Sequence, residues 1–173
     1  MRALLIAALL ATPALAAEPQ GGPVFAGFGK HTPVEHDVAI PKGMVLRHVY
    51  DVQPATPGKR NPGFETAARF INSHVANGMA ERDVAVAVVV HGSAIAELTK
   101  PEVYAARNNG AANASEAMVK EMLSRGVRFV VCGQAANAMG VKKADLLPGV
   151  ELAISASSAH AILQAQGYTL NPF

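Results

Sequence analysis

The sequence predicts a three-layer, flavodoxin-like α/β domain with a mostly parallel sheet of about five strands. Two observations support this prediction. Strand-like and helix-like segments alternate from Met44 to the end of the chain, which is the order that joins parallel strands by right-handed helical crossovers. Two of the strand-like segments, VAVAVVV and VRFVV, are continuous apolar runs, as expected of strands that helices cover on both faces.

The chain begins with the pattern of a secretory signal peptide, which we assign to residues 1–16. One arginine precedes an apolar run from Ala3 to Leu10, and small residues at Ala14 and Ala16 match a cleavage site. The run is shorter than the roughly 20 residues that a membrane-spanning helix needs. We therefore expect export to the periplasm and no stable membrane insertion after the signal is removed. An anchor that is never cut is the alternative.

The mature chain is expected to contain an arm and one domain. Residues 17–43 are rich in glycine and proline and show no periodicity, so they predict an irregular arm. This arm is expected to lie over the body of the domain or over a neighbouring subunit. Residues 44–173 are expected to form the α/β domain.

Within that domain the expected elements follow one another in a regular order. The first strand is expected at 44–52, and the first helix at 64–78, with apolar residues on one face and Gly78 suited to its carboxyl end. Residues 97–113 indicate a loop or a short broken helix. The helix that follows has Asn113 and Ser115 as alternative caps. The remaining strands are expected at 84–92, 127–133, 151–156 and 168–173, and the remaining helices at 113–126, 134–140 and 157–167.

Composition narrows the classes of partner and cofactor. The net charge is +2, with no basic run and no tryptophan, which argues against nucleic acid as a partner. The chain lacks GxGxxG, P-loop and GxSxG motifs, so no cofactor is expected. Hydrophobic residues make up 50% of the chain and charged ones 16%, which favours a homo-oligomer.

The candidate catalytic residues stand at the ends of the two apolar strands. VAVAVVV runs into His91, and VRFVV runs into Cys132, the one cysteine of the chain. If these strands are neighbours, both side chains emerge at the carboxyl edge of the sheet, where α/β proteins collect their chemistry. A thiolate at Cys132 would be stabilised by the first amides of the next helix or by His91. The alternatives are a buried, inert cysteine and a structural histidine.

Further polar and glycine residues near these strand ends are candidates for binding. Arg107, Asn108 and Asn109 lie in the loop after VAVAVVVHG, where they either line the pocket beside the strand ends or belong to a solvated loop. His31, His36, His48 and His160 have no assigned role. A copper or zinc site made of His91, Cys132 and one of these histidines is an alternative, although the spacing matches no closed metal motif. The candidate binding residues are Gly92, Asn108, Asn109, Gly133, Gln134 and Asn137.

The ordered set VVVHGSAI, NNG and LSRGVRFVVCGQAANAMGV…LLPGV…GY resembles the DsrE/DsrF-like family of small sulfur-metabolism proteins. The resemblance covers roughly residues 45–173. It implies a three-layer α/β fold and homo-oligomers, often trimers or hexamers. In active members a cysteine at the end of this strand accepts sulfur as a persulfide, and Cys132 stands at the matching place. No second cysteine is present to resolve a persulfide.

These observations lead to two hypotheses about function. In the first, a periplasmic sulfur-handling protein uses Cys132 to accept sulfane sulfur from a donor and to pass it to an acceptor thiol. The partners are then a sulfur donor and an acceptor, each a small molecule or a protein thiol. In the second, the protein is a non-catalytic oligomeric binding or assembly module, and Cys132 is an inert core residue.

Overall fold

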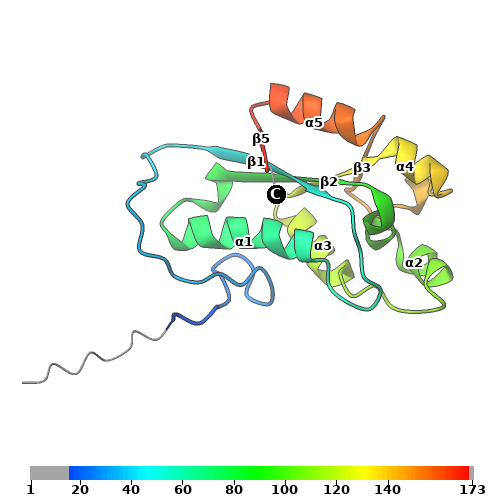
Figure 1. Ribbon diagram of the computed structural model, residues 1–173, viewed down its shortest axis with the longest axis horizontal. Helices are drawn as coiled ribbons and strands as arrows, with labels where there is room; N and C mark the ends of the chain where they lie inside the picture. Colours follow the sequence, from blue (N-terminus) through cyan, green and yellow to red (C-terminus); the bar gives the residue numbers. More distant parts are fainter. Residues whose placement is uncertain (1–15, 172–173) are drawn as a thin grey trace, which may run out of the picture.

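The computed structural model describes residues 16–171 and contains a five-stranded sheet in the order β4-β3-β2-β1-β5. Every pair of neighbouring strands is parallel. The three-layer, flavodoxin-like α/β fold is therefore confirmed (Figure 1). The strands are β1 (Leu46–Val52), β2 (Val84–Val90), β3 (Arg128–Cys132), β4 (Glu151–Ala153) and β5 (Thr169–Leu170).

The helices lie on both faces of the sheet and beyond its carboxyl edge. Figure 1 shows α5 above the sheet, α1 and α3 below it, and α2 and α4 beside the ends of β2 and β3. The α-helices are α1 (Pro62–Ala76), α2 (Pro101–Arg107), α3 (Glu116–Ser124), α4 (Gly133–Ala138) and α5 (Ala156–Ala165), and the 3₁₀ turns are η1 (Glu81–Asp83), η2 (Gly92–Leu98) and η3 (Lys143–Asp145).

The two faces of the sheet carry cores of very different size. The face toward α1 and α3 holds most of the buried apolar side chains, including Phe64 and Phe129, whose rings meet edge to face with centroids 5.2 Å apart. The face toward α5 holds a small cluster that includes Val49, Val89 and Val130. Asp51, near the end of β1, lies on this same face and bonds to His160 of α5.

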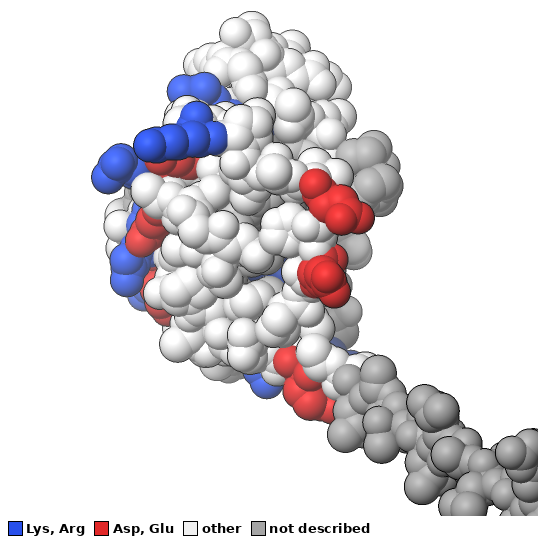
Figure 2. Space-filling view, turned by 90° about the vertical axis from the view of Figure 1, so that its left-hand side faces the viewer, with Lys and Arg blue, Asp and Glu red and all other residues white. Residues whose placement is uncertain are grey.

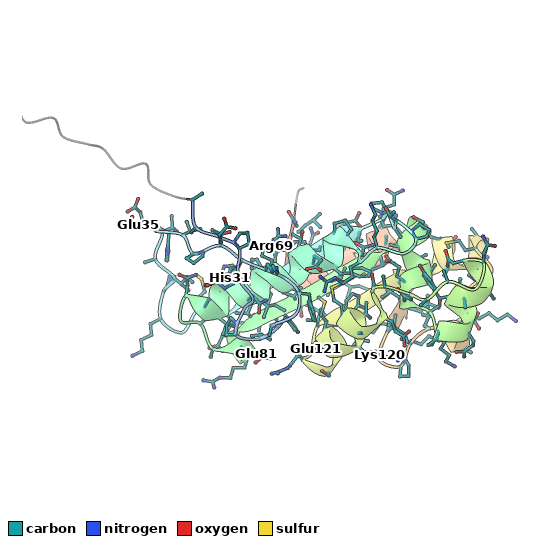
Figure 3. All side chains as sticks on the ribbon, turned by 90° about the horizontal axis from the view of Figure 1, so that it is seen from below. His31, Glu35, Arg69, Glu81, Lys120 and Glu121 are labelled. Atoms are coloured by element: carbon teal, nitrogen blue, oxygen red, sulfur yellow. The ribbon has the colours of Figure 1, made fainter. Side chains whose placement is uncertain are left out.

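The arm packs against α1 of its own chain through a buried amide. Asn72, on α1, accepts hydrogen bonds from the backbone N–H groups of Val24 and Phe25 and donates to three arm carbonyls. Phe25 and Phe28 of the arm are buried and stacked. Figure 3 shows the arm, with His31, running along α1. Tertiary hydrogen bonds therefore order a segment whose sequence lacks periodicity.

The cap of α3 differs from the predicted one. Ser115 occupies the N-cap position but makes no side-chain capping bond. Its hydroxyl instead donates to the buried carboxylate of Glu97 and accepts from the backbone N–H of Asn61. The prediction that Asn113 or Ser115 caps the helix was thus wrong for Ser115, because a tertiary partner takes its hydroxyl. Asn113 accepts from the N–H of Ser115.

The signal peptide assigned to residues 1–16 lies almost wholly outside the described residues. Within residues 16–171, no helix is both long and apolar enough to cross a bilayer.

Candidate functional site

The register of the sheet brings His91 and Cys132 side by side. Val90 of β2 pairs with Val131 of β3; His91 directly follows β2, and Cys132 is the last residue of β3. The two residues therefore occupy neighbouring positions, and among the described residues no hydrogen bond joins their side chains. Val89 and Val130, two positions earlier, both face α5. Because side chains alternate along a strand, His91 and Cys132 also face α5.

Cys132 is buried, with 7% of its surface exposed, at the junction of β3 and α4. It occupies the N-cap position of α4 but makes no side-chain capping bond. The amide of Gln134, one of the first in α4, donates to the carbonyl of Ile154 at 3.2 Å. The first turn of α4 is therefore partly used to hold the residue that follows β4.

A carboxylate lies between two histidine rings on this face of the sheet. Oδ2 of Asp51, on β1, lies 2.9 Å from Nε2 of His91, and Oδ1 lies 2.8 Å from Nε2 of His160 on α5. Each carboxylate oxygen thus has its own imidazole. The three side chains form a chain of hydrogen bonds that runs from α5 through β1 to β2 and ends at the neighbour of Cys132.

The charge of Asp51 follows from this arrangement. Burial raises the pKa of its carboxyl, but hydrogen bonds from His160 and His91, and the positive charges that these rings can carry, together lower the pKa below its usual value. Asp51 is therefore an ionised acceptor at neutral pH.

A cavity of about 360 Å³ lies beside the carboxyl edge of the sheet, between η2, α2 and the end of α4. Arg107 and Asn108 line it, together with apolar walls from Tyr104 and Met139. Arg107 is anchored there by donating to the carbonyls of Met139 and Gly140. None of the residues that line the cavity belongs to the Asp51, His91, His160 and Cys132 set, so the predicted binding residues divide between two places.

The side chain of Glu97 forms one polar wall of this cavity and is almost fully buried. It accepts hydrogen bonds from the side chains of Asn61 and Ser115. Burial raises the pKa of Glu97, and these two hydrogen bonds only partly offset the effect.

Gly92 and Gly133, two of the predicted binding residues, allow tight backbone packing. Gly133 packs so closely that a Cβ there would lie 2.4 Å from the carbonyl oxygen of Ala153. Gly92 has a φ of +59°, and a Cβ there would lie 2.7 Å from the side chain of Gln53. Both residues therefore let the chain turn tightly at the ends of β3 and β2.

The predicted polar binding residues are scattered. Asn108 lines the cavity and donates to the carbonyl of Tyr104, while Asn109 is exposed with a φ of +54°. Gln134 and Asn137 are exposed on α4. The structure thus brings His91 and Cys132 together and places Asn108 in the separate cavity.

Asp51 was missing from the candidate residues, and His160 was named only among the histidines without an assigned role. The one sequence signal for Asp51 was its place in a strand, two residues after Val49, which puts both on the same face. For His160 the sequence held no comparable sign, because its partner lies 109 residues away.

The other histidines lie away from this site. His31 is buried in the arm, His36 bonds to the carbonyl of Val34, and His48 bonds to the hydroxyl of Thr169. Within the described part of the chain, no three or more His, Cys, Asp or Glu side chains are arranged to hold a metal ion.

Comparison with known proteins identifies the family. The model of the DsrE/DsrF-like family matches residues 52–172. Among solved structures, the chain is similar to a protein of unknown function from Methanobacterium thermoautotrophicum, MTH1491, with 22% identity and a TM-score of 0.46 over 73% of this chain and 97% of that one. No curated protein matches the sequence significantly. Because the family model spans most of the chain and includes β2, β3, His91 and Cys132, this protein belongs to the DsrE/DsrF-like family.

Proposed function

We propose that the protein handles sulfane sulfur in the periplasm, with Cys132 accepting sulfur as a persulfide and passing it to an acceptor thiol. Membership of the DsrE/DsrF-like family supports an association with sulfur relay. The observation that carries the finer proposal is the register that puts His91 beside Cys132 at the carboxyl edge of the sheet. A base next to a thiol is the arrangement that makes cysteine a nucleophile.

The proposed reaction needs no oxidant. The thiolate of Cys132 attacks the outer sulfur of a persulfide or polysulfide donor, a new S–S bond forms, and the donor's own S–S bond breaks. The donor leaves as a thiolate or shorter polysulfide with the electron pair. In the second step an acceptor thiolate attacks the outer sulfur of the Cys132 persulfide, and Cys132 is the leaving thiolate.

Transfer through the protein is the experiment that tests this proposal. The purified mature chain is loaded with polysulfide, freed of excess reagent and offered a small thiol acceptor such as glutathione. Glutathione persulfide should appear with the wild-type chain and not with Cys132→Ser. Equal yields from the two chains would overturn the proposal.

The export part of the proposal rests on the pattern of residues 1–16. Expression of the full chain in a bacterium with a periplasm should yield a protein whose mass corresponds to a chain beginning at Ala17. An uncut chain in the cytoplasm would contradict it.

Homo-oligomer formation is also part of the proposal, and the surface of α5 supports it. Residues 152–171 contain no lysine, arginine, aspartate or glutamate. Ile154 and Ile162 are 79% and 54% exposed. In Figure 2 the top of the molecule, where α5 lies, is white. An uncharged apolar surface can meet a copy of itself without repulsion between like charges.

A binding module is the second candidate function. The burial of Cys132 and the separate 360 Å³ cavity favour it. Alkylation distinguishes the two candidates, because a carrier cysteine reacts in the native protein at neutral pH, whereas an inert one reacts only after unfolding.

A further inference from the structure

The carboxylate of Asp51 is hydrogen-bonded to two imidazole rings. A carboxylate only accepts hydrogen bonds, so the Nε2 atoms of His91 and His160 must both carry a hydrogen when they bond to it at 2.9 and 2.8 Å. Asp51 therefore fixes the tautomer of each neutral ring as the Nε2–H form. In each ring the basic atom is then Nδ1.

The two rings differ in what surrounds that second nitrogen. Nδ1 of His160 is buried and has no hydrogen-bond partner within residues 16–171. A proton added there would become a buried donor without an acceptor, which is unfavourable. The contact that His160 makes in this site is therefore its Nε2 hydrogen bond to Asp51, and its Nδ1 has no neighbouring group with which to exchange a proton among residues 16–171.

His91 has the opposite setting. Its side chain is 27% exposed, against 15% for His160. It lies beside Cys132 across the β2–β3 register. A proton taken up at Nδ1 of His91 gives an imidazolium whose charge the ionised Asp51 neutralises.

We propose that Asp51 and His160 are positioning residues that hold His91 in the Nε2–H tautomer, with Nδ1 as the atom that takes the proton of the Cys132 thiol. The inference rests on the proposed function, since it supplies the thiolate that persulfide formation requires. His160 acts one step further away, by binding the second oxygen of Asp51 and so fixing the plane of the carboxylate toward His91. The arrangement follows the logic of a nucleophile, a base and a third group that orients the base.

The proton balance of the sulfur step is complete within these groups. The thiol proton of Cys132 moves to Nδ1 of His91, and the thiolate attacks the outer sulfur of the donor. The leaving thiolate then takes the proton from His91, which returns to its neutral form. Asp51 and His160 keep their own protonation states throughout.

Among the described residues, the other charged side chains on this face lie away from His91, toward the amino ends of the strands. The elements around His91 contribute Asp51 from β1, Cys132 from β3 and His160 from α5. The neighbouring residues of η2, α4 and the end of β4, which include Ser93, Gln134 and Ile154, are uncharged. Arg47 lies near the start of β1. Arg128, at the start of β3, pairs with Glu151 at 2.8 Å and also donates to Gln166.

The test is the pH dependence of Cys132 alkylation by iodoacetamide, followed by mass spectrometry on the folded protein. Four variants are compared with wild type: H91Q, D51N, H160L and H160Q. His160→Leu removes the donor to Asp51, whereas His160→Gln keeps an N–H donor near the place of Nε2. His48→Gln is the control. His48 lies on β1, as Asp51 does, but on the opposite face of that strand, so the change alters a histidine hydrogen bond away from Asp51.

We expect D51N and H160L to lower the alkylation rate at pH 7 by about 3- to 10-fold and to move the midpoint of the profile upward, since thiolate is the reactive form. H91Q should lower the rate at least as much. H160Q should stay within about twofold of wild type, because the donor to Asp51 is retained, and H48Q should match wild type. A purely structural role for His160 would instead change thermal stability and leave the pH midpoint in place, which would overturn the proposal.

A second measurement covers the case in which H160L or D51N fails to fold. Long-range ¹⁵N–¹H correlation spectra of the wild-type protein report the tautomer of each histidine. The Nε2–H form of His91 and His160 at pH 7 supports the proposal, and the Nδ1–H form of His91 overturns it. Should the pH profiles shift as expected while polysulfide leaves no sulfur on Cys132, the positioning role stands and the proposed function fails.

Discussion

Nε2 of His160 donates a hydrogen bond to Oδ1 of Asp51 at 2.8 Å, joining α5 to β1 across 109 residues of sequence. The bond matters because the other oxygen of the same carboxylate holds His91, the neighbour of Cys132. The helix that closes one face of the sheet is thereby connected to the candidate nucleophile. The site is thus built from four elements, β1, β2, β3 and α5.

The first prediction concerns the attachment of the arm. Asn72→Ala leaves the arm's backbone groups at Val24 and Phe25 without their partner, so we expect it to lower the free energy of unfolding by roughly 2–3 kcal/mol. The arm should also become accessible, and trypsin should cut after Lys30 faster than in wild type. Asn77→Ala, at the exposed end of the same helix, is the control and should leave the cleavage rate at Lys30 unchanged. Slow cleavage in N72A as well would contradict the assigned role of Asn72.

The second prediction concerns the tight junction after Cys132. Gly133→Ala places a Cβ 2.4 Å from the carbonyl oxygen of Ala153, so β4 must shift. We expect a loss of roughly 1–3 kcal/mol in the free energy of unfolding, measured by urea denaturation. Gly27→Ala is the matched control, because a Cβ there meets no atom within 4 Å. Equal stabilities of the two variants would show that the junction is looser than described.

The third prediction is a pH dependence that arises from Glu97. Because burial raises the pKa of Glu97, the folded state favours the protonated carboxyl. Its contribution to stability is complete below the ordinary glutamate pKa of about 4.3 and is lost as the pH rises through the raised value. Glu97→Gln stays neutral, so its stability relative to wild type should improve as the pH rises from about 4 to 7. Exposed Glu102→Gln serves as control. Parallel pH curves for wild type and E97Q would refute this assignment.

The fourth prediction concerns assembly through α5. Ile162→Glu puts a charge on an apolar surface and should reduce the mass of the oligomer seen in sedimentation at micromolar concentration. Val38→Glu, on an 85% exposed arm residue, should leave that mass unchanged. A wild-type chain that sediments as a monomer would rule out the proposed oligomer.

The sequence predicted the fold class, and it named two of the four residues of the candidate site. VAVAVVV and VRFVV are apolar throughout, so both were expected in the middle of a parallel sheet, and their ends gave His91 and Cys132. The sequence alone does not give the strand order. These two residues are neighbours because β2 pairs with β3 in the sheet.

The other two residues of the candidate site, Asp51 and His160, meet through a contact that leaves no pattern in the nearby sequence. Asp51 meets His160 because α5 crosses the opposite face of the sheet from α1 and returns the chain to β5, next to β1. The role of Asn72 could not be predicted from the sequence either, because its hydrogen-bond partners are backbone groups of an irregular arm. Ser115 was assigned to a cap because local rules take no account of the buried carboxylate of Glu97.

The persulfide role of Cys132 is tested by the intact mass of the purified protein after brief exposure to polysulfide, measured beside Cys132→Ser. We expect the wild-type protein to gain whole sulfur atoms that a reductant removes, and the variant to gain none. An unchanged wild-type mass, together with a thiol that reacts with alkylating reagent only after unfolding, would contradict it and leave Cys132 as a residue of the core.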